Sequence, residues 1–333
     1  MRFYSIIIPV YNRPDELAEL LDSLTKQHYR QFEVIIIEDG SVNTSAEVVQ
    51  RYESLLDIHY LVVENMGQGF ARNLGFSKAR GDYFIVFDSD TILPTHYLES
   101  VDKRLGYGFL DAYGGPDRAD EQFSSLQKAI SYAMTSFFTT GGIRGKTKNA
   151  GGTFQPRSFN MGISRRVFLE TGGFAKRDMG EDIELGIRMQ QYNYRIGLIP
   201  EAYVYHKRRG NFLDFWKQVH SFGRTRFFLD DMHPRLGLIK PVHAFPALFV
   251  LFCVLIPVWY YLFMPFFWLS VALLAIFTGT ILVDSLVKNK SLLIALLSVG
   301  ASFVQLFGYG TGFLREAVAR IKRFKAFTSG SSK

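Results

Sequence analysis

A long run of residues without charge sets the first condition on this chain, because such a run is difficult to accommodate in a soluble fold. Between Lys240 and Asp284 there is no Asp, Glu, Lys or Arg over 43 residues, and a second uncharged run extends from Ser291 to Leu314. A membrane-spanning helix needs about 20 predominantly apolar residues, so the first run can hold two crossings and the second can hold one. Helices of soluble proteins keep a polar face, which these runs lack. We therefore expect two to three hydrophobic membrane segments within residues 241–314.

The excess of basic residues lies next to these uncharged runs. The net charge of the 333 residues is +7, but residues 1–202 contain 22 basic and 26 acidic side chains. Residues 203–241 contain eight basic and three acidic side chains, and residues 315–333 contain six and one. This distribution suits anionic lipid headgroups, whereas a nucleic-acid-binding protein would carry its basic residues on the folded domain. We expect membrane lipids and no nucleic acid as partners, and the single cysteine, Cys253, excludes a disulfide framework.

The first third of the chain alternates short apolar runs with amphipathic ones, which predicts strands and helices in turn. The apolar runs are continuous and rich in Ile and Val, as in strands of a parallel sheet that are buried on both faces. Strands are expected at Tyr4–Val10, Phe32–Ile37, Ile58–Val63 and Tyr83–Phe87, and helices at Pro14–Gln27, Thr44–Tyr52 and Gly67–Arg80. This order indicates βαβ units and an α/β fold with an open, wound, mostly parallel sheet. Because the first strand follows Met1 almost directly, no signal peptide is expected.

Polar residues follow three of these strands directly. They are Tyr11-Asn12, Glu38-Asp39-Gly40-Ser41 and Asp88-Ser89-Asp90. Ligands of open α/β sheets bind beyond the carboxyl ends of the strands. Asp88 and Asp90 stand two residues apart and project the same way in extended chain, and a divalent cation would relieve the repulsion between them. Such an ion can bridge phosphate oxygens and stabilise a departing diphosphate, so the sequence predicts a metal and phosphate site here.

Five ordered motifs give the chain a resemblance to a known family. The motifs are Ser5–Asn12 (SIIIPVYN), Glu38–Ser41 (EDGS), Asn65–Gly75 (NMGQGFARNLG), Gly81–Asp90 (GDYFIVFDSD) and Gly180–Leu185 (GEDIEL). In this order and spacing the chain resembles the family 2 glycosyltransferases over roughly residues 3–225. The resemblance implies the GT-A fold, which binds nucleotide-diphospho-sugars, and transfer with inversion at the anomeric carbon. A dinucleotide-binding oxidoreductase is excluded because no G-x-G-x-x-G follows the first strand.

The resemblance implies how the nucleotide of the donor is bound. It places Asp39 at the nucleobase or ribose, and it makes Pro9 and Tyr11 the neighbouring wall. Arg72, in GQGFARN, matches an arginine that lies near the base and the phosphates. The alternative for Arg72 is a surface charge without such a role.

The resemblance also implies a metal centre. Asp88 would face the sugar-nucleotide and Asp90 would bind the ion directly, which would be Mg²⁺ or Mn²⁺. His206, in the run YVYH, would join the metal, although a single histidine can equally be structural. The three basic residues that follow it could neutralise the diphosphate or could meet lipid headgroups; they are Lys207, Arg208 and Arg209.

On the acceptor side, the resemblance assigns the catalytic base to an acidic pair. Glu181-Asp182 resembles the family's E-D pair, whose aspartate removes the proton of the attacking hydroxyl group. Acidic residues at a helix start can also stabilise the helix dipole, which is the alternative for this pair. Asn160, in FNMGISR, stands where the family often has a loop that contacts the sugar.

Together these features predict a GT-A catalytic domain over residues 1–235 and a basic tail at 315–333. Within the domain, residues 211–232 are expected either to lie in the membrane interface or to pack on the catalytic domain. The expected reaction is metal-dependent transfer of one sugar from a nucleotide-diphospho-sugar to a lipid-linked or glycan acceptor. Two alternatives remain, a processive polysaccharide synthase and a non-catalytic scaffold. Gln218 and Arg224 do not have the spacing of the Q-x-x-R-W signature of processive synthases, and the tryptophan is absent.

The charges predict where the chain lies relative to the membrane. Nucleotide sugars are cytosolic, so the catalytic domain is expected on the cytosolic face of the membrane. In a bacterium this membrane would be the inner membrane. Three crossings would place the basic tail outside, against the positive-inside tendency. We therefore expect two true crossings and a cytosolic tail. The glycine-rich third segment suits a re-entrant or interfacial path; the first segment, with Pro246 and Pro257, is the other candidate for incomplete crossing.

Overall fold

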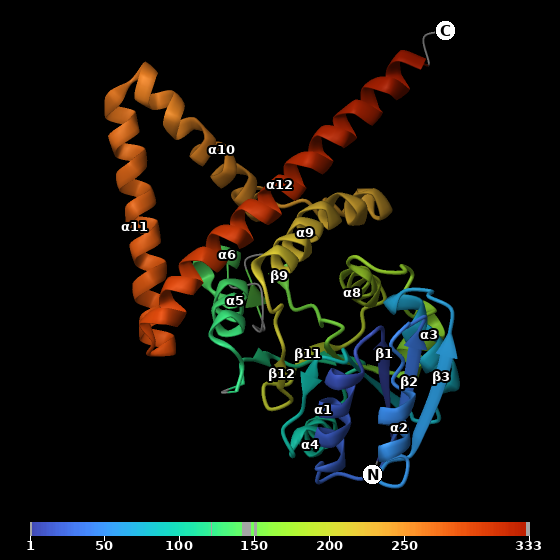
Figure 1. Ribbon diagram of the computed structural model, residues 1–333. Helices are drawn as coiled ribbons and strands as arrows, with labels where there is room; N and C mark the ends of the chain where they lie inside the picture. Colours follow the sequence, from blue (N-terminus) through green and yellow to red (C-terminus); the bar gives the residue numbers. More distant parts are fainter. Residues whose placement is uncertain (1, 121, 142–147, 150–151, 331–333) are drawn as a thin grey trace. The chain divides into compact units, whose positions relative to one another are not determined.

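The computed structural model describes residues 2–120, 122–141, 148–149 and 152–330, and the chain divides into two compact units (Figure 1). Residues 1–121 and 145–207 form one unit, here named the sheet unit, and residues 122–144 and 208–333 form the other, named the helical unit. These bounds differ from a single domain over residues 1–235, because residues 122–144 and 208–235 fold with the apolar helices.

The sheet unit alternates strands and helices as the sequence predicts, with additional short strands after residue 90. Its elements are β1 (Tyr4–Val10), α1 (Pro14–Thr25), β2 (Phe32–Asp39), α2 (Ala46–Tyr52), β3 (Ile58–Val63), α3 (Gln68–Lys78), β4 (Tyr83–Phe87), β5 (Thr91–Ile92), α4 (Tyr97–Tyr107), β6 (Ala112–Gly114), β7 (Asp117–Arg118), β8 (Lys148–Asn149), β9 (Gly152–Thr153), β10 (Asn160–Ser164), α7 (Arg165–Thr171), α8 (Glu181–Gln191), β11 (Ile196–Leu198) and β12 (Val204–His206).

A seven-stranded sheet forms the centre of this unit, in the order β11-β6-β10-β4-β1-β2-β3. Strand β1 pairs in parallel with β2 and β4, and β2 pairs in parallel with β3. Strand β10 is antiparallel to β4 and β6. A smaller sheet has the order β5-β12-β7. The expected wound, mostly parallel α/β sheet is confirmed.

Helices on both faces of the sheet explain why its strands are apolar without alternation. On β1, Ile6 and Ile8 belong to the core cluster that includes α1 and α4, whereas Ile7 belongs to the cluster that includes α3 and α8. All three side chains have no exposed surface. Burial of an Ile side chain contributes roughly 1.5–3 kcal/mol, so both faces stabilise the central strand. The polar residues after the strands are thereby held on a rigid edge.

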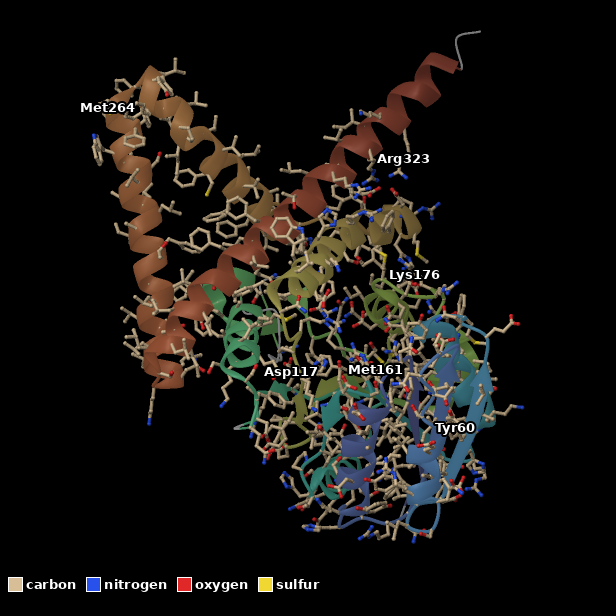
Figure 2. All side chains as sticks on the ribbon, viewed as in Figure 1. Tyr60, Asp117, Met161, Lys176, Met264 and Arg323 are labelled. Atoms are coloured by element: carbon tan, nitrogen blue, oxygen red, sulfur yellow. The ribbon has the colours of Figure 1, made fainter. Side chains whose placement is uncertain are left out.

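The helical unit contains the predicted apolar segments. Its elements are α5 (Ser125–Thr135), α6 (Phe137–Thr140), α9 (Phe212–Met232), the 3₁₀ turn Pro234–Leu236, α10 (Pro241–Leu262), α11 (Met264–Asn289) and α12 (Leu292–Gly330). Three of its helices are long and apolar enough to cross a membrane: α10, α11 and residues 292–323 of α12. On both sides of the turn at Met264, along α10 and most of α11, the side chains are almost entirely carbon (Figure 2). Nitrogen and oxygen atoms gather instead around Arg323.

Helix α12 packs closely along α9 through glycines. A Cβ atom on Gly312 would lie 2.1 Å from the carbonyl oxygen of His220, and one on Gly223 would lie 2.2 Å from that of Tyr309. Glycine at these positions therefore lets the two backbones touch. Helix α12 is also continuous from Leu292 to Gly330. A re-entrant path would need a break in the helix, so this continuity argues against it; the path of the segment relative to the membrane stays a prediction.

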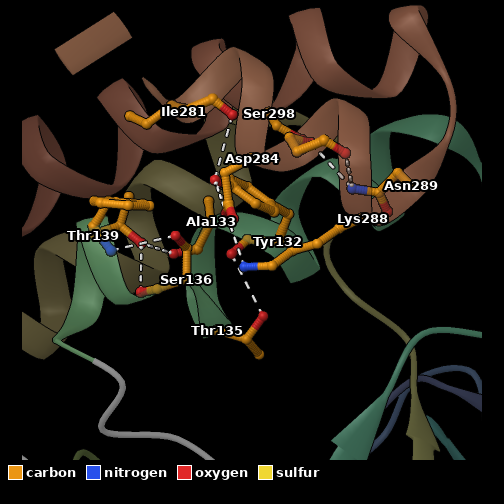
Figure 3. Close-up of polar contacts among 12 residues, drawn as sticks. Tyr132, Ala133, Thr135, Ser136, Thr139, Ile281, Asp284, Lys288, Asn289 and Ser298 are labelled. Atoms are coloured by element: carbon orange, nitrogen blue, oxygen red, sulfur yellow. Dashed lines mark hydrogen bonds and ion pairs between the residues drawn. The ribbon is translucent and has the colours of Figure 1, made fainter. Parts of the chain in front are cut away.

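Polar side chains join α5 to the end of α11. The hydroxyl of Tyr132 donates to Oδ2 of Asp284 at 2.7 Å, and Nζ of Lys288 lies 2.8 Å from the same oxygen (Figure 3). On the next face of α11, the hydroxyl of Ser285 bonds to that of Ser298 on α12 at 2.8 Å. Helix α5, although distant in sequence, is thus fixed to α11.

Candidate active site

The residues that follow β1, β2 and β4 lie at one edge of the sheet, because these three strands run in parallel. The loop after β2 is fixed by Glu38, which is fully buried. Its carboxylate accepts hydrogen bonds from the backbone N–H of Ser45 at 2.7 Å and from the hydroxyl of Tyr60 at 2.8 Å. Glu38 therefore shapes this edge and is not itself presented to a ligand.

Asp88, Asp90 and His206 come together at this edge. Asp88 and Asp90 follow β4, and His206 ends β12, where its Cα is paired with that of Thr91 on β5. One ligand atom from each of the three side chains lies within 4.8 Å of the others. The strand pair β5–β12 thus brings the histidine next to the aspartates, as the resemblance implies.

Asp90 lies between the side chains of His206 and Arg13. Nε2 of His206 is 3.2 Å from its Oδ1, and Nη1 of Arg13 donates a short hydrogen bond to its Oδ2. Burial by itself raises the pKa of Asp90, but His206 and Arg13 outweigh burial and hold this pKa below its ordinary value. The Asp90 carboxylate is therefore ionised, as a metal ligand must be.

The side chains in this cluster suit a divalent metal ion. Carboxylate oxygens are ligands for Mg²⁺ and Mn²⁺, and an imidazole nitrogen suits a transition metal. Oδ1 of Asp90 is buried and accepts no hydrogen bond in the described part of the chain, although it faces His206. A buried polar atom without a hydrogen bond is costly unless a ligand completes it. Asp88, Asp90 and His206 would hold such an ion.

A second group of titratable side chains lies at the opposite end of β2, formed by Glu33, Asp57 and His59. Protein donors already occupy its central carboxylate. The hydroxyl of Ser5 and Nε of Arg80 bind Glu33 at 2.6 and 2.7 Å. Arg80 also pairs with Asp57. This group is a structural ion-pair cluster, and it offers a control for experiments on the metal site.

Arg72 is completely buried and joins the two predicted acidic pairs. Its Nη2 donates to Oδ1 of Asp88 at 2.7 Å, and its Nη1 donates to Oε1 of Glu181 at 2.8 Å. Nε2 of Gln68 donates to the same oxygen of Glu181 at 2.7 Å. A guanidinium in this position orients two carboxylates, and the surface-charge alternative for Arg72 is wrong. Its expected contact with base and phosphates stays a prediction.

The structure distinguishes the two members of the E-D pair. The side chain of Glu181 is 3% exposed, whereas that of Asp182 is 16% exposed. Burial and the neighbouring Asp182 raise the pKa of Glu181 against the opposing effect of Arg72. Oδ2 of Asp182 lies 3.6 Å from Nη1 of Arg157. Asp182 is therefore the more exposed carboxylate of the pair, whereas Glu181 accepts hydrogen bonds from Arg72 and Gln68; the role of Asp182 as the base stays a prediction.

The residues expected around the nucleotide differ in exposure. Both carboxylate oxygens of Asp39 accept backbone hydrogen bonds, from Met66 at 2.7 Å and from Gly67 at 2.9 Å, and the residue is 4% exposed. Asp39 thus fixes the loop that opens α3. Tyr11 is 53% exposed, and Pro9 is partly buried on β1. Tyr11 offers a free aromatic face on which a base could stack.

Asn160 is buried without exposed surface, which differs from a sugar-contacting position. Its Oδ1 accepts from the hydroxyl of Tyr97, and its Nδ2 donates to the carbonyl of Ala202 at 2.8 Å. Both functions of the amide are thereby engaged, so Asn160 joins β10 to the turn before β12. A contact with the sugar would require these bonds to break.

The three basic residues after His206 separate in the structure. Lys207 pairs through Nζ with Glu19 on α1, and its backbone N–H donates to the carbonyl of Asp90 at 3.0 Å. Arg208 and Arg209 belong to the helical unit. Of the three, Lys207 therefore helps to fix the loop of Asp90, and the diphosphate role of all three stays a prediction.

Sequence reasoning missed Arg13, Gln68 and Arg157. Arg13 directly follows the strand-end residues Tyr11-Asn12, so its place in the first loop could have identified it. Gln68 lies within the motif of Arg72 but carries no charge. Arg157 stands in a stretch without periodicity, and nothing in its surroundings indicates that it meets Asp182.

Comparison with known proteins agrees with this geometry. The model of the family described as Glycosyl transferase family 2 matches residues 5–171, half of the chain. A poly-beta-1,6-N-acetyl-D-glucosamine synthase of Staphylococcus epidermidis is 25% identical over 220 residues, which cover 64% of this chain and 52% of the synthase. An undecaprenyl-phosphate 4-deoxy-4-formamido-L-arabinose transferase of Pseudomonas fluorescens is 33% identical over 130 residues, 37% of this chain and 38% of the transferase. The matched regions span 15% to 58% of the length of these and similar curated relatives.

A solved structure extends the likeness to the fold of most of the chain. The mannosyltransferase PcManGT from Pyrobaculum calidifontis, in complex with GDP-Man and Mn²⁺, superposes with a TM-score of 0.60 at 19% identity and covers 92% of this chain and 87% of its own. At this identity the likeness shows the fold, which is that of the GT-A glycosyltransferases. Since the family match includes four of the five motifs and all three strand ends that build the site, this chain is a glycosyltransferase and belongs to family 2.

Proposed function

We propose that this glycosyltransferase uses a divalent metal ion and transfers a sugar, with inversion, from a nucleotide-diphospho-sugar to a lipid-linked or glycan acceptor at the cytosolic face of a membrane. The observation that carries the proposal is the bridge made by Arg72. One buried guanidinium binds both Asp88, one of the three proposed metal ligands, and Glu181, next to the proposed base. Donor and acceptor groups therefore belong to one site.

On the donor side, the protein supplies charges of both signs. The bound ion would neutralise the diphosphate as it departs. Asp88, Asp90 and His206 would hold that ion, and Asp39 and Tyr11 lie on the neighbouring loops where the nucleoside would bind. Because the strand ends and their loops are fixed by buried hydrogen bonds, the site is preformed, which lowers the cost of charge stabilisation in the transition state.

On the acceptor side, Asp182 would take the proton of the attacking group. Inversion in one displacement requires the acceptor to attack from the side opposite the leaving diphosphate, and a hydroxyl acceptor needs a base there. Arg157 lies 3.6 Å from Asp182 and would keep this carboxylate charged and oriented. An acceptor that is a lipid phosphate is already ionised and would depend less on Asp182.

Within the helical unit, the packing of α12 supports two membrane crossings. Of residues 297–314, all of which the structure describes, none is exposed. Helix α12 runs parallel to α9, since the contacts pair Gly300 with Phe212 and Arg320 with Asp230. Helix α9 carries six charged residues and cannot span a bilayer; they are Asp214, Lys217, Arg224, Arg226, Asp230 and Asp231. We propose that α12 lies at the depth of α9, in the interface.

Helices α10 and α11 suit the two crossings. At 1.5 Å per residue, the 22 residues of α10 extend about 33 Å, close to the ~30 Å hydrocarbon core. The turn between the helices is rich in interfacial aromatic residues, namely Trp259, Tyr260, Tyr261 and Trp268. A hairpin that crosses twice returns the chain to its starting side, so the basic tail would lie on the side of the catalytic residues.

The proposed reaction is tested by supplying the full-length chain, in membranes or in detergent with lipid, with a panel of nucleotide-diphospho-sugars. We expect release of nucleoside diphosphate from one donor class, dependent on Mg²⁺ or Mn²⁺ and increased by membrane lipid. Absence of release with every donor in the presence of lipid and metal would contradict the proposal.

A processive polysaccharide synthase is the second candidate, and its support is the likeness to the staphylococcal synthase over 64% of this chain. The two functions differ in their product. Single transfer gives one sugar per acceptor at any donor excess, whereas a processive enzyme gives long chains while most acceptor is unused. Mass spectrometry of the lipid-extractable product separates them.

A further inference from the structure

Arg13 forms a hydrogen bond to the carboxylate of Asp90, which is the proposed metal ligand. It is the residue before α1, and its guanidinium donates to Oδ2 of Asp90 from a side chain that is 30% exposed. Asp90 is 13% exposed and faces His206 on its other oxygen. In this state, therefore, Arg13 occupies Oδ2 of Asp90, and Oδ1 faces the imidazole of His206.

The backbone that carries Arg13 is fixed, whereas its side chain is long and partly exposed. Asn12 has a positive φ of 53°, and its Oδ1 accepts hydrogen bonds from the N–H groups of Val42 and Asn43 at 2.8 and 2.9 Å. Its own N–H donates to Oγ of Ser41 at 2.7 Å. These bonds tie the first loop to the loop after β2. For Arg13 to leave Asp90, its partly exposed side chain would have to rotate while this loop stays in place.

Binding of a metal ion and of the donor diphosphate would change the electrostatic environment of Arg13. A divalent cation on Asp90 would stand within a few ångströms of the guanidinium, where repulsion between positive charges is strong. The diphosphate of the donor brings negative charge to the same place, and a guanidinium binds phosphate oxygens with well-directed hydrogen bonds. Repulsion by the metal ion would therefore favour release of Arg13 from Asp90, and the diphosphate would provide a new partner for its guanidinium.

We propose that Arg13 is a stand-in cation, which neutralises Asp90 until the metal ion arrives and then moves to the diphosphate of the nucleotide donor. This inference rests on the proposed metal-dependent function and assigns a donor-binding role to a residue outside the predicted site. The proposal predicts that Arg13 has opposite effects on the affinities for the two ligands. Arg13 weakens binding of the metal alone and strengthens binding of a nucleoside diphosphate to the metal-loaded protein. Such couplings typically amount to 5–150-fold in affinity.

The test uses the detergent-solubilised full-length chain and Mn²⁺, with free Mn²⁺ measured by electron paramagnetic resonance. The variants are Arg13→Gln and Arg13→Lys. Arg166→Gln is the matched control, because Arg166 also forms an arginine–carboxylate pair, with Glu170 on α7, away from the metal cluster. Each protein is titrated with Mn²⁺ alone, and then with UDP and with GDP at saturating Mn²⁺.

For Arg13→Gln we expect Mn²⁺ alone to bind roughly 10-fold tighter than to the wild type. At saturating Mn²⁺ we expect UDP or GDP to bind roughly 10-fold weaker than to the wild type. Arg13→Lys keeps the charge and should stay near the wild type for Mn²⁺, as should Arg166→Gln for both ligands. Unchanged or weaker Mn²⁺ binding by Arg13→Gln would overturn the inference, and so would equal behaviour of the Gln and Lys variants. If the wild type binds no Mn²⁺, the proposed metal-dependent function fails, and this inference fails with it.

Discussion

Nη1 of Arg72 lies 2.8 Å from Oε1 of Glu181, and neither side chain is exposed by more than 3%. The same guanidinium holds Asp88 through Nη2 at 2.7 Å. A charge that is buried to this degree depends on its partners, because water cannot replace them. Arg72 on α3 therefore connects Asp88, after β4, to Glu181 at the start of α8. We expect a change at Arg72 or Glu181 to affect both stability and activity.

The first prediction concerns this connection. Arg72→Met should lower the free energy of unfolding of the sheet unit by about 3–5 kcal/mol, because it leaves Glu181 buried with its charge uncompensated. The double variant Arg72→Met/Glu181→Gln should recover part of this stability without recovering transfer. Unfolding is followed by far-UV circular dichroism in urea, since the three Trp residues, Trp216, Trp259 and Trp268, all lie in the helical unit. Equal stability of the single and double variants would contradict a direct pair.

The second prediction assigns the catalytic base. Asp182→Asn keeps the shape of the side chain and removes its basicity, so kcat with a hydroxyl acceptor should fall by at least the ~10²-fold typical of acid–base groups. Binding of the nucleoside diphosphate should change little. Glu181→Gln should instead lower the thermal stability of the sheet unit. If Glu181→Gln abolishes transfer at unchanged stability while Asp182→Asn remains active, the assignment within the pair is reversed.

The third prediction concerns the metal. Asp90→Ala should abolish transfer and leave the circular dichroism spectrum intact, because Asp90 is the proposed metal ligand and lies in a loop outside the hydrophobic core. Excess chelator should have the same effect on the wild type, with recovery on addition of Mg²⁺ or Mn²⁺. Asp57→Ala, in the ion-pair cluster at the other end of β2, is the control and should retain metal-dependent activity. Full activity of the wild type in excess chelator would rule out the metal-dependent mechanism.

The fourth prediction concerns the side of the membrane on which the tail lies. In a Cys253→Ser background, Ser331→Cys should not react with a membrane-impermeant thiol reagent added to intact cells, and it should react after the membrane is opened. The control is a cysteine in place of Tyr261, at the turn between α10 and α11, which should be labelled from outside. Labelling of position 331 in intact cells would mean that α12 also crosses.

The fifth prediction concerns the connection between α5 and α11. Tyr132→Phe removes the hydroxyl that donates to Asp284 at 2.7 Å and should destabilise the helical unit by about 1.5–3 kcal/mol, the range for a hydrogen bond to a charged group. Trp fluorescence reports this unit, because all three Trp residues belong to it. Tyr261→Phe, also in the helical unit and with a parent side chain that is 84% exposed, is the control and should be neutral. Equal midpoints for both variants would show that the bond contributes nothing.

Local pattern was sufficient for the strands, the apolar helices and the carboxylates after β4. Tyr4–Val10 and Tyr83–Phe87 are continuous apolar runs, and each is a buried parallel strand with the bounds that the sequence predicts. The uncharged residues 241–283 lie within α10 and α11. These features depend on residues that are neighbours in the chain, whose hydrophobic period and charge are visible in one sequence.

Tertiary structure decided what these residues contact. Arg13 meets Asp90, and Arg72 meets Glu181, across 77 and 109 positions of the chain. His206 reaches the aspartates because β12 pairs with β5, and the glycines of α12 serve contact with α9 and not a break in the helix. Sequence determines which side chains carry charge or bulk. Strand pairing and helix packing between distant segments determine which of these side chains meet in one buried space. Such contacts are strong because water is excluded there, but they produce no pattern among neighbouring residues in the sequence.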